Sequence, residues 1–240
     1  RRAAELIKYA SNAFLATKIT FINELSNLCE KIDVNIEDIS IGMGLDKRIG
    51  SRFLRAGPAY GGSCFPKDTL ALVRTAREAG SPIKIVEAVV QVNEDRKRYM
   101  AEKVVTACGG SVEGKKVAVL GLTFKPNTDD MRDSPSLVII PALIEKSAKV
   151  FAYDPKCMDE AREILQGVHW CKGSYETLEG ADVVVILTEW NEFRALDFAR
   201  MRSLMSHPVV VDLRNIYNLN EMVAAGFEYH CIGRNVSNDE

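Results

Sequence analysis

The 240-residue sequence is 47% hydrophobic and 27% charged, with a formal net charge of −2 at pH 7. This is an ordinary globular composition, without bulk attraction to nucleic acid or to an anionic membrane surface. No apolar run reaches the roughly 18 residues of a membrane span, and the charged, interrupted start does not resemble a signal peptide. The six cysteines form no CxxC pair. We therefore expect no disulfide framework and no metal site, and we predict a reduced, cytoplasmic protein.

The first 32 residues predict a long amphipathic helix, because apolar residues recur at spacings of three and four up to about residue 33. Lys8 and Asn12 lie four residues apart and therefore on one face of this helix. From spacing alone they could be solvated surface residues, or a cation and an amide directed into a cleft. The chain starts in this helical pattern without a methionine, and we expect it to be a piece of a longer protein.

A short helix predicted over residues 36–41 precedes a loop rich in glycine and arginine. Arg48, Arg52 and Arg55 fall within eight residues of one another. They could form a solvated face, or they could bind phosphates, since the guanidinium fork matches phosphate geometry. The glycines of residues 57–62 suggest a backbone that passes close to a ligand.

The most informative stretch is Gly61-Gly62-Ser63-Cys64-Phe65-Pro66-Lys67-Asp68. Pro66 favours the first turn of a helix, which we predict over residues 67–79. Cys64 would then lie just before a helix N-terminus, where the dipole favours a thiolate, and Asp68 would face the same ligand about one turn later. A lone cysteine is more often a buried structural residue, but this setting favours a nucleophile.

A second long helix is predicted to begin at Ser81-Pro82, as cap and first residue, and to continue to Cys108, where Gly109-Gly110 stops it. At 1.5 Å per residue it would be roughly 40 Å long, enough to connect two domains. The predicted organisation is a helical domain over residues 1–81, a connecting helix over residues 82–108 and a second domain over residues 115–234.

After residue 114, short apolar segments alternate with helical ones, which is typical of a parallel sheet covered by helices on both faces. We therefore predict the α/β class, with an all-helical N-terminal part followed by a Rossmann-like domain. The six predicted strands cover residues 116–120, 150–153, 168–171, 183–187, 209–213 and 229–232. The predicted helices between them cover residues 136–148, with a kink at Pro141, 159–165, 175–178, 193–205 and 220–225.

The loop after the first predicted strand, residues 121–135, lies where open α/β sheets bind ligands. It lacks the dinucleotide fingerprint GxGxxG. Lys125 and Arg132 instead precede a predicted helix start at Ser134-Pro135, an arrangement suited to anions. A charged surface loop would give the same pattern.

Three stretches in this order resemble the UDP-glucose/GDP-mannose dehydrogenase family: residues 5–12 (ELIKYASN), the Cys64 motif, and residues 121–125 (GLTFK) continuing to Arg132. The resemblance covers nearly the whole chain and is strongest to the branch that oxidises UDP-glucose. It implies a NAD-dependent, two-step oxidation of the C6 alcohol of UDP-glucose to UDP-glucuronate. It also implies a homodimer formed through the helical domain and a C-terminal UDP-binding domain. The family's N-terminal NAD-binding domain has no counterpart in this sequence.

By this resemblance Cys64 adds to the aldehyde as a thiohemiacetal, and hydride loss leaves a thioester that water cleaves. Lys8 and Asn12 would bind the reacting oxygen, and Asp68 would orient or activate the water. The other substrate-binding residues implied are Arg48, acting across a dimer interface, Arg55, Tyr60, Gly61, Phe124, Lys125 and Arg214. The residues implied to meet NAD are Lys67 and Arg132.

The sequence leaves two alternatives. The first is a GDP-mannose 6-dehydrogenase, with the same chemistry on another base and sugar. The second is a non-catalytic module that binds sugar nucleotides or dimerises and merely retains the motifs.

Overall fold

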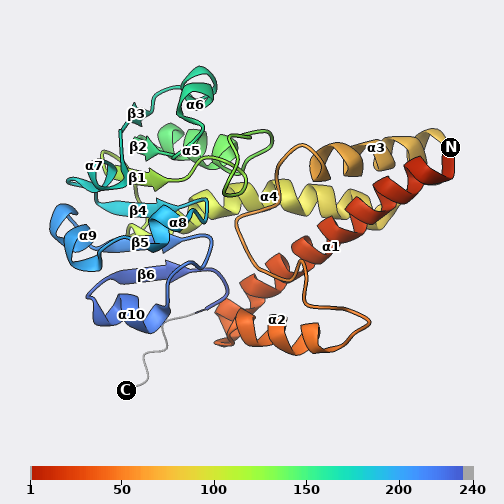
Figure 1. Cartoon of the computed structure of the whole chain (residues 1–240), viewed down its shortest axis with the longest axis horizontal. Coiled ribbons are helices and arrows are strands. Elements are labelled where there is room, and N and C mark those ends of the chain that lie inside the picture. Colours follow the sequence, from red (N-terminus) through yellow and green to blue (C-terminus); the bar gives the residue numbers. More distant parts are fainter. Residues whose placement is uncertain (1, 235–240) are drawn as a thin grey trace.

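The computed structural model describes residues 2–234 and has a helical N-terminal part followed by a sheet flanked by helices (Figure 1). This arrangement confirms the predicted α/β class. The short second helix continues past residue 41 to Leu45. The N-terminal helices are α1 (Arg2–Ile32), α2 (Ile36–Leu45), α3 (Phe65–Glu78) and α4 (Lys84–Ala107).

The long helices α1 and α4 form the frame of the helical part. Helices α3 and α4 both pack against α1, and α4 also packs against α5 of the sheet region. Figure 1 shows α4 running from the helical layer to the sheet. With 24 residues, α4 is about 36 Å long. It therefore contacts both parts of the chain, while the domain boundaries themselves stay a prediction.

The predicted Ser81-Pro82 start of α4 is wrong, because Ser81 closes α3 instead. Its backbone N–H donates to the carbonyl of Ala76 at 2.9 Å, and Gly80 between them adopts φ +69°. This is a glycine-based helix C-terminus. Helix α4 begins at Lys84, with Ile83 at the N-cap.

Six parallel strands within residues 2–234 form one sheet in the order β3-β2-β1-β4-β5-β6. In this doubly wound order the direction of winding reverses between β1 and β4, and ligands bind beside the carboxyl ends of such strands. Each strand ends within one residue of its predicted bounds. The strands are β1 (Lys116–Leu120), β2 (Lys149–Tyr153), β3 (His169–Trp170), β4 (Val183–Ile186), β5 (Val209–Asp212) and β6 (Glu228–Cys231).

The helices around the sheet follow the prediction with two corrections. The helix predicted over residues 136–148 ends at Glu145, because the chain turns at Ser147, where φ is +64°. The single helix predicted over residues 193–205 is two helices, α8 and α9, because the Asp197 side chain accepts a hydrogen bond from Arg200 N at 2.7 Å and caps α9. Pro141 lies inside α5 as predicted. The helices are α5 (Ser136–Glu145), α6 (Met158–Ile164), α7 (Ser174–Leu178), α8 (Asn191–Arg194), α9 (Phe198–Leu204) and α10 (Leu219–Ala224).

One apolar core joins the helical part to the sheet. It runs from Ile22 of α1 through Val104 of α4 to Val119 of β1, and a second cluster fills the opposite face of the sheet. The end of β6 is also attached to the helices: Gly233 accepts a hydrogen bond from Ile36 N at 2.8 Å. The two parts are thus packed against each other. Across residues 2–234, no helix is both long and apolar enough to cross a membrane.

Candidate active site

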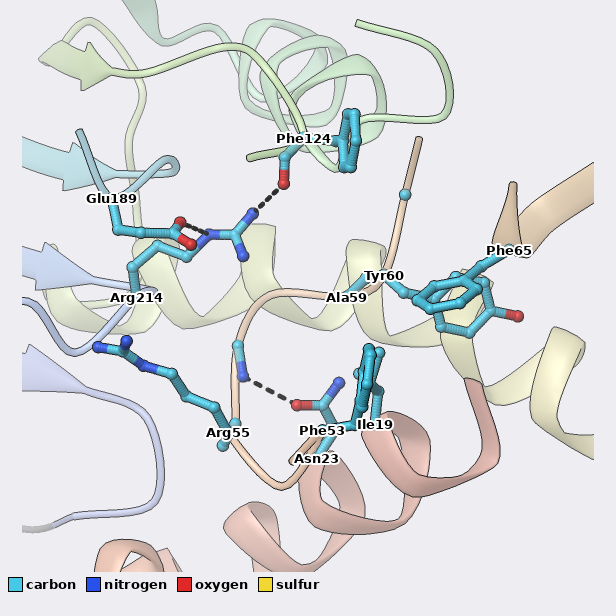
Figure 2. A pocket seen from close by; sticks show the side chains of 13 residues that line it. Ile19, Asn23, Phe53, Arg55, Ala59, Tyr60, Phe65, Phe124, Glu189 and Arg214 are labelled. Atoms are coloured by element: carbon cyan, nitrogen blue, oxygen red, sulfur yellow. Dashed lines mark hydrogen bonds and ion pairs between the residues drawn. The ribbon is translucent and has the colours of Figure 1, made fainter. Parts of the chain in front are cut away.

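A cavity of about 240 Å³ lies between α1, the loop of residues 53–61 and the carboxyl ends of β1, β4 and β5 (Figure 2). This is the edge of the sheet at which open α/β folds bind ligands. Five predicted substrate-binding residues line it: Arg55, Tyr60, Gly61, Phe124 and Arg214. Five other lining residues were not predicted to bind substrate: Ile19, Asn23, Phe53, Phe65 and Glu189.

Arg214, just after β5, is the most firmly held cation of the cavity. Its Nε donates to the carbonyl of Leu187 at 2.7 Å and its Nη2 to the carbonyl of Phe124 at 2.9 Å. Nε also lies 3.2 Å from a carboxylate oxygen of Glu189, and the side chain is 14% exposed. The guanidinium therefore joins the loops that follow β1 and β4 to the one that follows β5, as Figure 2 shows.

The turn that carries Arg214 is built around Asp212, the buried last residue of β5. Its carboxylate accepts hydrogen bonds from the backbone N–H groups of Arg214 (2.9 Å), Ile216 (2.7 Å) and Tyr217 (3.1 Å), and from the Tyr229 hydroxyl (2.7 Å). Burial raises the pKa of Asp212 above its usual range. These bonds fix the backbone from which Arg214 reaches the cavity.

Arg55 adds a second cation to the same end of the cavity. It is exposed, and Figure 2 shows its guanidinium on the side of the cavity where Arg214 lies. Burial is the main cause that lowers the pKa of Arg214; Glu189 opposes this shift and Arg55 adds to it. Two guanidinium groups with one carboxylate leave this end with excess positive charge, which suits a phosphate group.

The loop of residues 53–61 is held by polar side chains of α1 and α4. Buried Arg96 donates from Nε to the carbonyl of Gly57 at 2.7 Å, and burial lowers the pKa of Arg96 to about 10, so it stays charged at neutral pH. Asn93 pairs with both backbone groups of Tyr60, accepting from its N–H at 2.9 Å and donating to its carbonyl at 3.1 Å. Asn23 accepts from Gly57 N at 2.9 Å. The shape of this wall is therefore set by buried hydrogen bonds.

The glycine pair before Cys64 passes against the loop that follows β1. Gly62 N donates to the carbonyl of Arg132 at 2.8 Å. Gly62 also has φ +82°, and a Cβ there would lie 2.7 Å from the ring of Phe124. Glycine is required here for both conformation and space. This contact brings the Cys64 motif together with the third motif, residues 121–132, although the two are far apart in the sequence.

Cys64 occupies the N-cap position of α3, which begins at Phe65. The thiol is exposed, unlike the five other cysteines of the chain. Its backbone carbonyl accepts from Asp68 N at 2.9 Å, as the first turn of the helix requires. Phe65 extends from this turn into the wall of the cavity. The structure thus places an accessible sulfur at a helix N-terminus, beside the cavity.

Asp68 joins α3 to α1. Its carboxylate is fully buried and lies 3.3 Å from the Lys8 ammonium, and it accepts a hydrogen bond from the Asn12 amide at 2.6 Å. Both contacts use Oδ2; Oδ1 is buried and has no hydrogen-bond partner among the described residues. Lys8 is 57% exposed. The structure therefore brings three of the four predicted catalytic side chains into contact.

The four predicted catalytic residues and four further predicted site residues do not line the cavity. The further four are Arg48, Lys125, Lys67 and Arg132. Arg48 is exposed and forms an ion pair with Asp46 at 2.6 Å. Lys125 is exposed, 5.2 Å from the centre of the Phe124 ring. Lys67 is exposed on the first turn of α3, and Arg132 pairs with Asp130 at 2.8 Å while its carbonyl holds Gly62.

Comparison with known proteins decides the family of the chain. The family described as UDP-glucose/GDP-mannose dehydrogenase matches residues 2–95 with its central domain and residues 118–219 with its UDP-binding domain. The chain belongs to the UDP-glucose/GDP-mannose dehydrogenase family. The resemblance of its three motifs to that family is confirmed.

Members of this family match the chain over nearly its full length. A UDP-glucose 6-dehydrogenase of Rhizobium meliloti (strain 1021) is 58% identical over 234 residues, which make up 98% of this chain and 54% of that protein. UDP-glucose 6-dehydrogenase TuaD of Bacillus subtilis (strain 168) is 48% identical over 233 residues, 97% of this chain and 50% of that protein. The chain spans about half the length of these relatives.

Solved structures give the same result. A UDP-glucose dehydrogenase from Pyrobaculum islandicum superposes with a TM-score of 0.84 at 38% identity, over 95% of this chain and 50% of that one. An NDP-N-acetyl-D-galactosaminuronic acid dehydrogenase from Methanosarcina mazei Go1 gives a TM-score of 0.87 at 28% identity, over 97% and 51%. The two structures have the family's fold in common with this chain.

Proposed function

We propose that this chain carries the substrate-binding site and the nucleophile of a UDP-glucose 6-dehydrogenase, which oxidises the C6 alcohol of UDP-glucose to the carboxylate of UDP-glucuronate. The main support is the placement of exposed Cys64 beside a cavity with an aromatic wall and a cationic end. The diphosphate would lie at Arg55 and Arg214, and the sugar would extend toward Cys64. The names of the most similar relatives give the same substrate.

In this proposal the Cys64 thiolate adds to the C6 aldehyde, forming a C–S bond and a thiohemiacetal oxyanion. Loss of hydride from C6 converts it to a thioester, and water then adds to the thioester carbonyl and releases the carboxylate and the thiolate. The helix N-terminus at Cys64 favours the thiolate form. The exposed position leaves the sulfur open to substrate.

Lys8, Asn12 and Asp68 would act on the oxygen atoms of this sequence. The exposed Lys8 ammonium can donate to the oxyanion on C6, which lowers the energy of both tetrahedral intermediates. Asn12 would hold the same oxygen or a water molecule. The unpaired Oδ1 of Asp68 is an acceptor for the attacking water. Their existing contacts orient them: Asp68 holds both of the other side chains.

NAD is the cofactor implied by the family. Its nicotinamide would supply the chemistry of a two-electron hydride acceptor in each oxidation. The residues of this chain that fit it are two exposed cations: Lys67, on the first turn of α3 that follows Cys64, and Arg132, whose carbonyl binds Gly62 N. They can bind an anionic pyrophosphate next to the exposed thiol.

Six free cysteines also agree with a reducing, cytoplasmic setting.

The test is turnover by the full-length protein with UDP-glucose and NAD. We expect two equivalents of NADH for each equivalent of UDP-glucuronate, with calorimetric binding of UDP-glucose much tighter than that of GDP-mannose. The reverse preference would favour the GDP-mannose alternative. The 240-residue chain alone should bind UDP-glucose weakly and give no NADH, and NADH production by this chain would contradict that expectation.

Iodoacetamide labelling separates an enzyme from a non-catalytic module. Burial raises the pKa of each of the five other thiols: Cys29, Cys108, Cys157, Cys171 and Cys231. They should react slowly at neutral pH, because the thiolate is the reactive form. We expect Cys64 to be labelled first, and equal labelling of all six would contradict an activated Cys64.

We also propose that the protein is a homodimer formed through α1. Ile7, Phe14, Phe21 and Leu28 recur every seven residues and are 50–66% exposed, so they form an apolar stripe that a second copy of α1 would cover. Arg48 lies outside the cavity of its own chain, which supports its assignment to the site of the second copy. Phe14→Glu with Phe21→Glu should give monomers in light-scattering measurements; an unchanged mass would contradict the proposal.

A further inference from the structure

Asn23 of α1 is a buried side chain whose amide oxygen forms a hydrogen bond and whose amide nitrogen forms none among the described residues. It is 1% exposed, and its Oδ1 accepts a hydrogen bond from Gly57 N at 2.9 Å. A backbone N–H can only donate, so the oxygen must face Gly57 and the other amide atom must be nitrogen. This Nδ2 group is buried and has no hydrogen-bond partner among the described residues. A buried donor left unpaired is unfavourable. A ligand atom that accepts a hydrogen bond from Nδ2 would remove this cost.

The free amide points into the cavity, at its apolar end. Asn23 lines the cavity together with Ile19, Phe53 and Tyr60. Figure 2 shows its nitrogen on the side opposite the bond to Gly57, toward Ala59 and Tyr60. The cationic end, with Arg214 and Glu189, lies on the other side. Phosphate groups belong at that end, and a flat ring belongs between the aromatic and aliphatic walls. The donor is therefore placed for the base of a nucleotide.

We propose that Asn23 Nδ2 donates to the O4 carbonyl of uracil and is a residue that determines base specificity. The inference rests on the proposed function, since it requires a nucleoside diphosphate in this cavity. Uracil and cytosine share O2 and the ring face. They differ at N3, a donor in uracil and an acceptor in cytosine, and at position 4, where uracil carries a carbonyl and cytosine an amino group. A fixed donor can form a hydrogen bond to the carbonyl of uracil. With cytosine it would face a second donor, the amino group, and no bond could form. Asn23 thus favours UDP over CDP.

The variant Asn23→Asp tests this with little change of shape. Its carboxylate keeps an acceptor for Gly57 N but replaces the donor by an acceptor, which suits the amino group of cytosine. Calorimetry on the full-length protein should show the UDP/CDP affinity ratio falling by about tenfold or more. Asn27→Asp is the matched control, because Asn27 accepts from the same Arg96 at 3.1 Å and does not line the cavity. It should leave the ratio unchanged.

Each outcome decides one question. If UDP and CDP weaken equally in Asn23→Asp, Asn23 serves only the loop or a ribose hydroxyl, and the specificity inference fails while the proposed function stands. If the wild-type protein binds neither UDP nor UDP-glucose, the proposed function itself fails.

A change in the ligand gives the same test without a variant. Sulfur is a weaker acceptor than oxygen, so the wild-type protein should bind 4-thio-UDP several-fold more weakly than UDP, with 2-thio-UDP nearly unaffected. Equal affinity for UDP and 4-thio-UDP would overturn the inference even if Asn23→Asp failed to fold.

Discussion

The cavity proposed to bind the nucleotide and the Cys64 segment are neighbours, but they are held in very different ways. Arg214, Asn93 and Arg96 each make at least two hydrogen bonds to backbone groups of the cavity wall. Cys64 and Lys8, in contrast, are exposed. The geometry for binding is fixed inside this chain. The reacting groups are left accessible, as they must be if substrate and cofactor meet at that surface.

This difference has an energetic basis. Buried charges such as Arg96 and Arg214 are tolerated only when backbone carbonyls pair with them, so removing one leaves unpaired groups in the protein interior. An exposed side chain can be removed at little cost to folding. Substitutions of the buried cavity residues should therefore affect binding and stability together, and substitutions of the exposed Cys64 and Lys8 should affect chemistry with little loss of stability.

The largest effect should come from Cys64→Ala in the full-length protein. Without the sulfur no thioester forms, and we expect formation of the acid to fall by about 10³-fold or more. Product analysis by NMR should show arrest at or near the aldehyde. Calorimetry should give an unchanged UDP-glucose affinity, because the exposed thiol does not line the cavity. Persistent formation of UDP-glucuronate would remove Cys64 from the mechanism.

In the cavity, Arg214→Ala should weaken UDP-glucose binding by about 10²-fold. The substitution removes one charge-assisted phosphate contact together with the hydrogen bonds that join three loops. Arg214→Lys should recover only part of this, because an ammonium lacks the planar fork. Arg194→Ala is the matched control: Arg194 donates to the carbonyl of Ile216 at the surface of the same region, 3.2 Å away. Unchanged affinity in Arg214→Ala would show that the cationic end does not bind the diphosphate.

The sequence predicted the strands well, because apolar runs between glycine-rich turns are a local signal that burial on both faces reinforces. It also placed Cys64 before a helix. It could not show that Gly62 and Arg132 meet, since a hydrogen bond across 70 residues of chain depends on packing. It missed Asn23, on a buried helix face, and Glu189, in the loop after β4, for a related reason: a polar residue in either place is recognisable as part of a site only after the opposite wall is known.

The predicted helix ends were less accurate where two signals competed. Ser81-Pro82 has the residue types of a helix start, yet Gly80 gave the preceding helix a C-terminal motif that uses Ser81 N. Asp197 has the residue type of an N-cap inside a segment whose apolar spacing predicted one continuous helix. At Ser81 a backbone hydrogen bond prevailed over the Ser-Pro signal, and at Asp197 a capping bond prevailed over the predicted continuity of the helix.

A third prediction concerns the contact between the two regions. Gly62→Ala should lower the free energy of unfolding by roughly 2 kcal/mol or more, because φ +82° and the Phe124 ring at 2.7 Å both oppose a Cβ. Gly42→Ala is the control: nothing lies within 4 Å of its added Cβ, and it stands inside α2. That change should stabilise the protein by about 0.5–1 kcal/mol in urea denaturation. Equal effects of the two would argue against a tight fit of the glycine pair on the β1 loop.

The smallest structural effect should come from Lys8→Ala. The Lys8–Asp68 pair joins a side chain that is 57% exposed to a buried carboxylate, and solvent screening limits its worth, so we expect a loss of about 0.5 kcal/mol or less in the free energy of unfolding. Asn12→Ala should cost more, about 1 kcal/mol, because the 2.6 Å bond to the buried Asp68 carboxylate is itself partly buried. Turnover should respond in the opposite order, since Lys8 is the cation that we propose for the developing oxyanion. If Lys8→Ala proved more destabilising than Asn12→Ala and left turnover intact, Lys8 would be a structural partner of Asp68. The proposed mechanism would then have no charged donor for the oxyanion.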